Sequence, residues 1–220
     1  MLAIEVITDE IPPLKVSDSG DKALSWMEEF KVYELPLVNG HQFLGLILES
    51  DLLDLNNPSI LLSEIHSPLN RPAVYGHDHF YSVISTMIEH KISVVAVLDK
   101  QENYLGMISQ RDLIKHISSI AAYKEPGGII ELEMNTNDYS LVEIANIIES
   151  NGGKVLSSYI KSKIDSTKIE VTIKTNKDDL SSILQTFTRY EYTIIASFDK
   201  SGSSDDLKQR YEAFMHFLNM

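Results

Sequence analysis

The chain of 220 residues contains no cysteine, which excludes a disulfide framework and any metal site that needs thiolate ligands. It also has no apolar run close to the roughly 20 residues that a membrane-spanning helix requires. The N-terminal stretch MLAIEVITDEIPPLK carries acidic residues where a secretory signal peptide needs basic residues followed by an apolar segment. We therefore expect a cytoplasmic protein without a membrane partner.

Clustered positive charge is missing as well. Lysine and arginine number 19 against 32 aspartates and glutamates, which gives a formal net charge of −13, and the basic residues are scattered along the chain. A chain of this charge repels nucleic acid and anionic lipid at long range. We therefore expect no nucleic-acid partner.

Common catalytic motifs are absent too. The sequence holds no Gly-x-Ser-x-Gly elbow, no Walker loop for phosphate and no zinc-protease motif. The string HDH at residues 77–79 has no third ligand at a suitable spacing, so we expect no metal site there. The sequence thus predicts a protein that is not an enzyme.

An internal repeat organises the first part of the chain. Its two copies are offset by 60 residues before a turn, NGHQ in one copy and DKQEN in the other, and by 61 residues after it. Duplicated domains tolerate a change of length in such a turn, so we interpret residues 1–61 and 62–122 as two copies of one domain. The matching pairs include Pro12 and Pro72, Asp18 and Asp78, Met27 and Met87, Glu29 and Glu89, Lys31 and Lys91, Gly45 and Gly106, Ile47 and Ile108, and Asp51 and Asp112.

Each copy predicts a helix, two strands and a closing helix. In the second copy, Asp78 is a suitable N-cap for an amphipathic helix with Phe80, Val83, Ile84, Met87 and Ile88 on one face. The segments ISVVAVLD and NYLGMIS then predict a β-hairpin, and a second helix follows from Asp112. These elements cannot bury both faces of their sheet alone, so we expect the two copies to pack together.

The string GMISQRD, residues 106–112, ends the last predicted strand of the second copy. By itself, its Gly-x-x-Ser-x-x-Asp pattern fits a strand that runs into a helix capped by Asp112. With the tandem repeat, however, the chain resembles a pair of CBS domains, known as a Bateman module. The resemblance covers roughly residues 1–121. It implies a regulatory sensor that takes an adenosine-containing ligand in the cleft between the copies and commonly dimerises.

The resemblance also implies which residues bind that ligand. In the family, the aspartate of the motif contacts the ribose hydroxyls and the hydroxyl side chain lies near the phosphate. A carboxylate can accept hydrogen bonds from two neighbouring hydroxyls, and serine can donate one to an anionic oxygen. On this chain the ribose is expected on Asp112 and a phosphate or other polar group near Ser109 and Arg111. The base is expected against the backbone of Arg71, Pro72, Ala73 and Val74.

The two copies are not equally faithful to the family pattern. The first copy has Leu48 where the second has Ser109, so we expect the second copy to bind the ligand. The basic pair that family members with charged nucleotides often carry is replaced by Tyr33 and Glu34 in the first copy and by Ser93 and Val94 in the second. A ligand with little negative charge is therefore favoured over a polyphosphate.

The remaining residues predict a different domain. YKEPGG, residues 123–128, is typical of a linker, and residues 129–200 follow a βαββαβ pattern that predicts a ferredoxin-like fold. Attached to a CBS pair, this domain resembles an ACT domain, and the combination resembles the acetoin-utilisation AcuB type. Its loop NTNDYS lacks the glycine that amino-acid-binding ACT domains often use. Residues 201–220 predict an amphipathic helix with Leu207, Tyr211, Phe214 and Leu218 on one face.

The expected architecture is thus α+β: a tandem CBS pair, a ferredoxin-like (ACT-like) domain and a C-terminal helix. The expected function is a sensor that binds AMP, ADP, ATP, adenosine or S-adenosylmethionine without a covalent cofactor and signals to a protein partner that the sequence does not identify. We also expect a homodimer, with Trp26 as a candidate contact. The alternative left open is a ligand-free scaffold that dimerises and whose cleft is vestigial.

Overall fold

The chain forms two compact units, Met1–Ile117 and Ser118–Met220. The computed structural model describes residues 1–8, 10–55, 57, 59–65, 68–120, 122–162 and 166–199. The amphipathic helix expected at 201–220 lies outside these residues. Among the described helices, none is long and apolar enough to cross a membrane.

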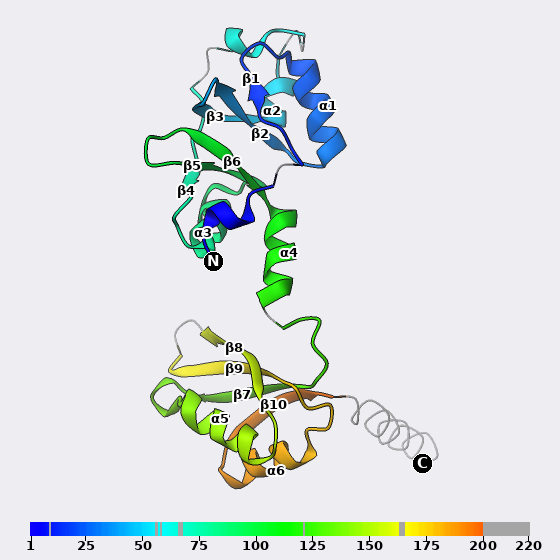
Figure 1. Cartoon of the computed structure of the whole chain (residues 1–220), viewed down its shortest axis with the longest axis vertical. Coiled ribbons are helices and arrows are strands. Elements are labelled where there is room, and N and C mark those ends of the chain that lie inside the picture. The colour runs from blue at the N-terminus through cyan, green and yellow to red at the C-terminus, as the bar shows by residue number, and fades with distance from the viewer. Residues whose placement is uncertain are drawn as a thin grey trace, which may run out of the picture. The chain divides into compact units, whose positions relative to one another are not determined.

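Unit 1 contains the two copies of the repeat, and both fold in the same way (Figure 1). Each copy has a three-stranded sheet in which the first two strands pair in parallel and the last two pair antiparallel, as expected for the hairpin. The first copy comprises β1 (Leu14–Lys15), α1 (Gly20–Phe30), β2 (Glu34–Asn39), β3 (Gln42–Leu48) and α2 (Glu49–Leu53). The second comprises β4 (Ala73–Tyr75), α3 (Phe80–His90), β5 (Val94–Leu98), β6 (Tyr104–Ser109) and α4 (Gln110–Ile120). The short 3-10 helices η1 (Ala3–Val6) and η2 (Leu62–Glu64) precede β1 and β4.

Unusual backbone conformations recur at matching positions of the two copies. Lys31 ends α1 with a φ of 57°, and Lys91 ends α3 with a φ of 55°. A left-handed residue that is not glycine is uncommon, so its recurrence at an offset of 60 residues supports duplication independently of the sequence match.

Asp18 and Asp78 also have the same structural role in the two copies, but this role is not helix capping. The carboxylate of Asp18 accepts a hydrogen bond from the backbone N–H of Lys15, and that of Asp78 accepts one from Tyr75, each at 2.8 Å. Both aspartates therefore close the turn after the first strand of their copy. The expectation that Asp78 caps α3 was wrong, because the N-cap of that helix is His79.

The two copies share one hydrophobic core, as expected for sheets that cannot bury both faces alone. The matching residues Met27 and Met87 are both buried in it, as are Ile47 and Ile108. Met1–Ile117 is therefore a single packed body that contains both copies of the repeat.

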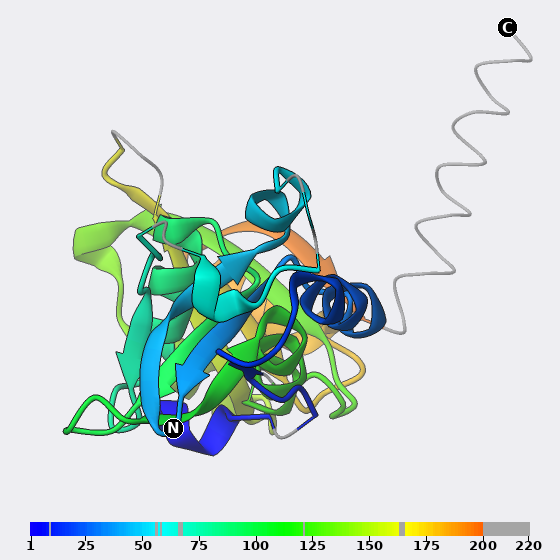
Figure 2. The same cartoon turned by 90° about the horizontal axis from the view of Figure 1, so that it is seen from above.

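The segment that leads into each copy crosses to the other copy. The backbone N–H of Thr8, ahead of β1, donates to the carbonyl of Met107 in β6 at 3.1 Å. In the same way, the N–H of Leu46 in β3 donates to the carbonyl of Asn70, ahead of β4, at 2.9 Å. In the view of Figure 2, η1 (dark blue) lies at the N-terminus, where Ala3 N–H bonds to the carbonyl of Asp78 in the second copy.

The glycine of GMISQRD makes this crossing possible. A Cβ atom on Gly106 would lie 2.5 Å from Cγ2 of Ile7, and one on the matching Gly45 would lie 2.5 Å from Cβ of Leu69. No side chain fits at such a distance. Glycine therefore stands at both positions because a segment from the other copy passes directly over the strand.

Unit 2 has the expected βαββαβ order. It comprises β7 (Ile129–Asn135), the 3-10 helix η3 (Thr136–Asp138), α5 (Leu141–Ser150), β8 (Val155–Ser162), β9 (Lys168–Thr175), α6 (Ser181–Arg189) and β10 (Thr193–Phe198). The antiparallel sheet has the order β10-β7-β9-β8, which is the ferredoxin-like arrangement. Its core contains Ile130, Val171 and Ile173 from the sheet with Ile144 and Phe187 from the helices.

Candidate functional site

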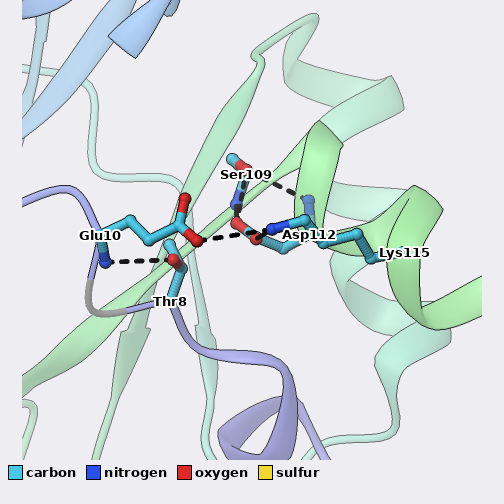
Figure 3. A network of polar contacts seen from close by, with 5 residues as sticks. All are labelled: Thr8, Glu10, Ser109, Asp112 and Lys115. Carbon is cyan, nitrogen blue, oxygen red and sulfur yellow. Dashed lines mark hydrogen bonds and ion pairs between the residues drawn. The ribbon is translucent and has the colours of Figure 1, made fainter.

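Ser109 and Asp112 join the end of β6 to the start of α4 through a reciprocal pair of hydrogen bonds (Figure 3). The backbone N–H of Ser109 donates to Oδ2 of Asp112 at 3.2 Å, and its hydroxyl donates to the same oxygen at 2.5 Å. The N–H of Asp112 donates in return to Oγ of Ser109 at 3.2 Å. This is a capping box. The expected helix start was therefore wrong: α4 begins at Gln110, with Ser109 as its cap.

The corresponding position in the first copy has no such cap. Leu48 precedes α2 and makes no capping hydrogen bond from its side chain. Because the first copy has Leu48 instead of serine, it lacks both the capping box and a candidate ligand contact.

Asp112 is held inside a wider polar network (Figure 3). It is 8% exposed, and its second carboxylate oxygen, Oδ1, lies 3.7 Å from Nζ of Lys115. The same Nζ lies 3.5 Å from Oε1 of Glu10, whose backbone N–H donates to Oγ1 of Thr8 at 3.2 Å. Lys115 therefore links the start of α4 to the N-terminal segment that crosses over β6.

A cavity of about 660 Å³, which we call the Asp112 cavity, opens at this network. This volume lies in the range of pockets that hold small-molecule ligands. Both copies and the N-terminal segment contribute to its walls. It is lined by Thr8, Glu10, Ile11, Glu29, Phe30, Lys31, Val32, Ser93, Ser109, Gln110, Arg111, Asp112, Ile114 and Lys115.

The structure thus brings together Ser109, Arg111 and Asp112 but not the other expected site residues. Arg71, Ala73 and Val74 line a separate cavity of about 220 Å³, and Pro72 lines neither of the two. Residues 71–74 therefore line no cavity in common with Asp112. The cause is the crossing of the leading segments, which brings Thr8, Glu10 and Ile11 to the second copy's cleft.

Arg71 is engaged within its own cavity. Its guanidinium donates to the carbonyl of Phe43 at 3.2 Å and lies 3.6 Å from the carboxylate of Glu102. The Arg71 guanidinium thus contacts the β-hairpins of both copies, at Phe43 and Glu102, and lines a different cavity from Asp112.

A buried carboxylate from the first copy supports the wall of the Asp112 cavity. Glu34 in β2 is 5% exposed and accepts hydrogen bonds from the backbone N–H groups of Ser93 and Val94, the latter at 2.9 Å. The hydroxyl of Ser93 is itself buried without a hydrogen-bond partner among the described residues. The start of β5, and with it one wall of the cavity, is therefore fixed by a side chain from the other copy.

The histidines at 77–79 have local roles. His79 caps α3, where its Nδ1 accepts a hydrogen bond from Tyr81 N–H at 3.4 Å, and His77 packs against Tyr75. Within the described residues, no three histidine, aspartate or glutamate side chains are grouped to hold a metal ion.

Unit 1 is therefore a pair of α+β repeats with one core and a ligand-sized cavity beside the second repeat. Residues 62–119, the second repeat, match the family model of the CBS domain. Solved structures that are similar to the chain include CBS domain proteins.

A CBS domain pair/ACT domain protein from Thermotoga maritima is 21% identical, with a TM-score of 0.47, over 54% of this chain and 98% of that one. CBSX2 in complex with AMP is 19% identical, with a TM-score of 0.47, over 54% and 97%. The CBS domains of a transcriptional regulator from Streptococcus pneumoniae are 17% identical, with a TM-score of 0.46, over 52% and 98%. At these identities and TM-scores the likeness supports no statement about the function of this chain.

Proposed function

We propose that unit 1 is a non-enzymatic sensor that binds an adenosine-containing ligand in the Asp112 cavity and signals to a protein partner. The ligands considered are AMP, ADP, ATP, adenosine and S-adenosylmethionine. The observation that carries the proposal is the position of Asp112: a nearly buried carboxylate at the start of a helix, in the wall of a cavity of about 660 Å³.

The second carboxylate oxygen of Asp112 is placed to accept hydrogen bonds from a ribose. Its Oδ2 accepts both hydrogen bonds from Ser109, whereas Oδ1 faces Lys115 at 3.7 Å, too far for a hydrogen bond. Oδ1 therefore retains capacity to accept from ligand hydroxyls. A ribose there would obtain charge-assisted hydrogen bonds, which are stronger than neutral ones.

Unit 2 is proposed to be an ACT-like domain, as in AcuB-type proteins, on the basis of its topology. A cavity of about 290 Å³ at the end of β7 is lined by four acidic residues, Glu133, Asp138, Glu143 and Glu191, of which Glu133 pairs with Lys168. These charges would repel the carboxylate of a free amino acid. We therefore assign no amino-acid binding to this unit.

The scaffold alternative is supported by the capping box itself. Ser109 and Asp112 satisfy each other without a ligand, so the motif has a structural role that would persist in an empty cleft.

Ligand-dependent thermal stability separates the two functions. A ligand that binds only the folded state must raise apparent stability by RT ln(1 + [L]/Kd), about 2.7 kcal/mol at 100 Kd. We expect at least one of adenosine, AMP, ADP, ATP and S-adenosylmethionine to raise the melting temperature of the full chain. The variant Arg71→Gln should retain that shift, because Arg71 lines a different cavity. If none of the five compounds shifts the melting temperature, the scaffold function is favoured.

We further propose that the protein is a homodimer through the outer face of α3 and α4. This face forms an apolar groove in which Ile88 is 72% and Ile114 is 68% exposed. Trp26, by contrast, packs partly against the core of its own unit. Ile117 lines the same groove and is 39% exposed. The double substitution Ile88→Glu with Ile117→Glu is expected to turn a dimer into a monomer in light scattering at micromolar concentration. A monomeric mass for the unmodified chain would contradict the dimer.

A further inference from the structure

Most charged side chains around the Asp112 cavity already have partners. Lys115 lies between Glu10 and Asp112 and contacts both carboxylates. Lys31 forms an ion pair with Glu28, which lies outside the lining. These groups offer a ligand little net charge.

Two charged side chains of the lining differ from the rest. Arg111 and Glu29 make no ion pair or side-chain hydrogen bond with any residue that the structure describes. The wall thus presents one available cation and one available anion, contributed by different copies of the repeat.

The helix ends reinforce these two charges. Arg111 is the second residue of α4 (Gln110–Ile120), where the helix N-terminus carries a partial positive charge. Glu29 is the last residue but one of α1 (Gly20–Phe30), where the helix C-terminus carries a partial negative charge. An anionic group is therefore favoured near Arg111 and a cationic group near Glu29.

We propose that the ligand of the Asp112 cavity is a nucleoside with a zwitterionic 5′ substituent, whose carboxylate binds Arg111 and whose ammonium binds Glu29. This inference rests on the proposed function and narrows its ligand class to adenosyl amino acids. A di- or triphosphate needs several cations, and in the described lining only Arg111 is not already paired.

Two compounds that differ in whether the thioether carries an amino-acid end or a methyl group test the proposal. S-Adenosylhomocysteine and 5′-methylthioadenosine share the nucleoside and the thioether, but only the first carries an amino-acid end. We expect S-adenosylhomocysteine to bind about tenfold more tightly than 5′-methylthioadenosine, as measured by titration calorimetry on the full chain. Both protein side chains are exposed, so each charge pair contributes roughly two- to fivefold.

The substitution Glu29→Gln should reduce that tenfold advantage to about threefold and leave the affinity for 5′-methylthioadenosine unchanged. Arg111→Gln should act in the same way. Glu89→Gln is the matched control, because Glu89 occupies the equivalent position of the second copy and does not line the cavity. It should change neither affinity.

The outcomes separate this inference from the proposed function. If the two compounds bind equally, or if ADP or ATP binds more tightly than S-adenosylhomocysteine, the zwitterion proposal is wrong while the nucleoside sensor stands. An equal effect of Glu29→Gln and Glu89→Gln would also overturn it. If none of these compounds binds, the proposed function fails as well.

Discussion

The variant Asp112→Ala is expected to lose more ligand affinity than any other single substitution in the Asp112 cavity. It removes the carboxylate that would accept from the ribose hydroxyls, which should weaken binding by ~1.5–3 kcal/mol. It also leaves the buried N–H of Ser109 without its acceptor and breaks the capping box. The free energy of unfolding should therefore fall by about 1–2 kcal/mol. Titration calorimetry and urea unfolding measure the two effects separately.

Asp51→Ala, the same change in the first copy, is the matched control. Asp51 is exposed, and Leu48 gives its helix no side-chain cap, so we expect a change of less than about 0.5 kcal/mol in either quantity. Asp112→Asn separates charge from capping, because its amide oxygen can still accept from Ser109 N–H. Equal losses of binding in Asp112→Ala and Asp51→Ala would show that the ligand does not depend on the second copy.

Regular elements could be predicted closely from the sequence because their patterns are local. The strands expected from ISVVAVLD and NYLGMIS are β5 (Val94–Leu98) and β6 (Tyr104–Ser109), each within its expected segment. Helix starts were less certain. Serine and aspartate are both good N-caps, and the capping box uses Ser109 and Asp112 together, so residue type alone could not place the boundary.

The grouping of the candidate site could be predicted only in part. Ser109, Arg111 and Asp112 are neighbours along the chain, and a helix start keeps them together. Whether the segment ahead of each copy pairs with its own copy or with the other depends on long-range packing. In a duplicated sequence both arrangements present similar strands to that segment, so the pattern does not distinguish them. This is why Thr8 and Glu10 were missed and why Arg71, which lines a separate cavity, was expected beside Asp112.

One signal for the missed contact between the copies was present in the sequence. Glu34 begins the segment ELPLV, whose other residues are apolar, whereas the matching position of the second copy holds Val94. A charged residue that enters a buried strand needs a partner. In the structure these partners are the two N–H groups at the start of β5, which no pattern along the chain connects to Glu34.

The variant Glu34→Ala is accordingly expected to have the largest effect on folding. It leaves the N–H groups of Ser93 and Val94 without an acceptor, and an unsatisfied buried group costs about 1–3 kcal/mol. The free energy of unfolding should fall by about 2–4 kcal/mol, measured by urea denaturation. Both N–H groups donate to the same oxygen of Glu34, Oε1. Glu34→Gln can keep that oxygen as a neutral, weaker acceptor and should lose about half as much.

Glu28→Ala is the control for removing a glutamate of unit 1, since the side chain of Glu28 is 77% exposed and its ion pair with Lys31 is a surface contact. We expect it to change the free energy of unfolding by less than about 0.5 kcal/mol. Because Ser93 lines the Asp112 cavity, Glu34→Ala should also weaken ligand binding at temperatures where the variant is still folded, whereas Glu28→Ala should not. If Glu34→Ala is as stable as Glu28→Ala, the carboxylate does not hold the two copies together, and the wall of the cavity is fixed by apolar packing alone.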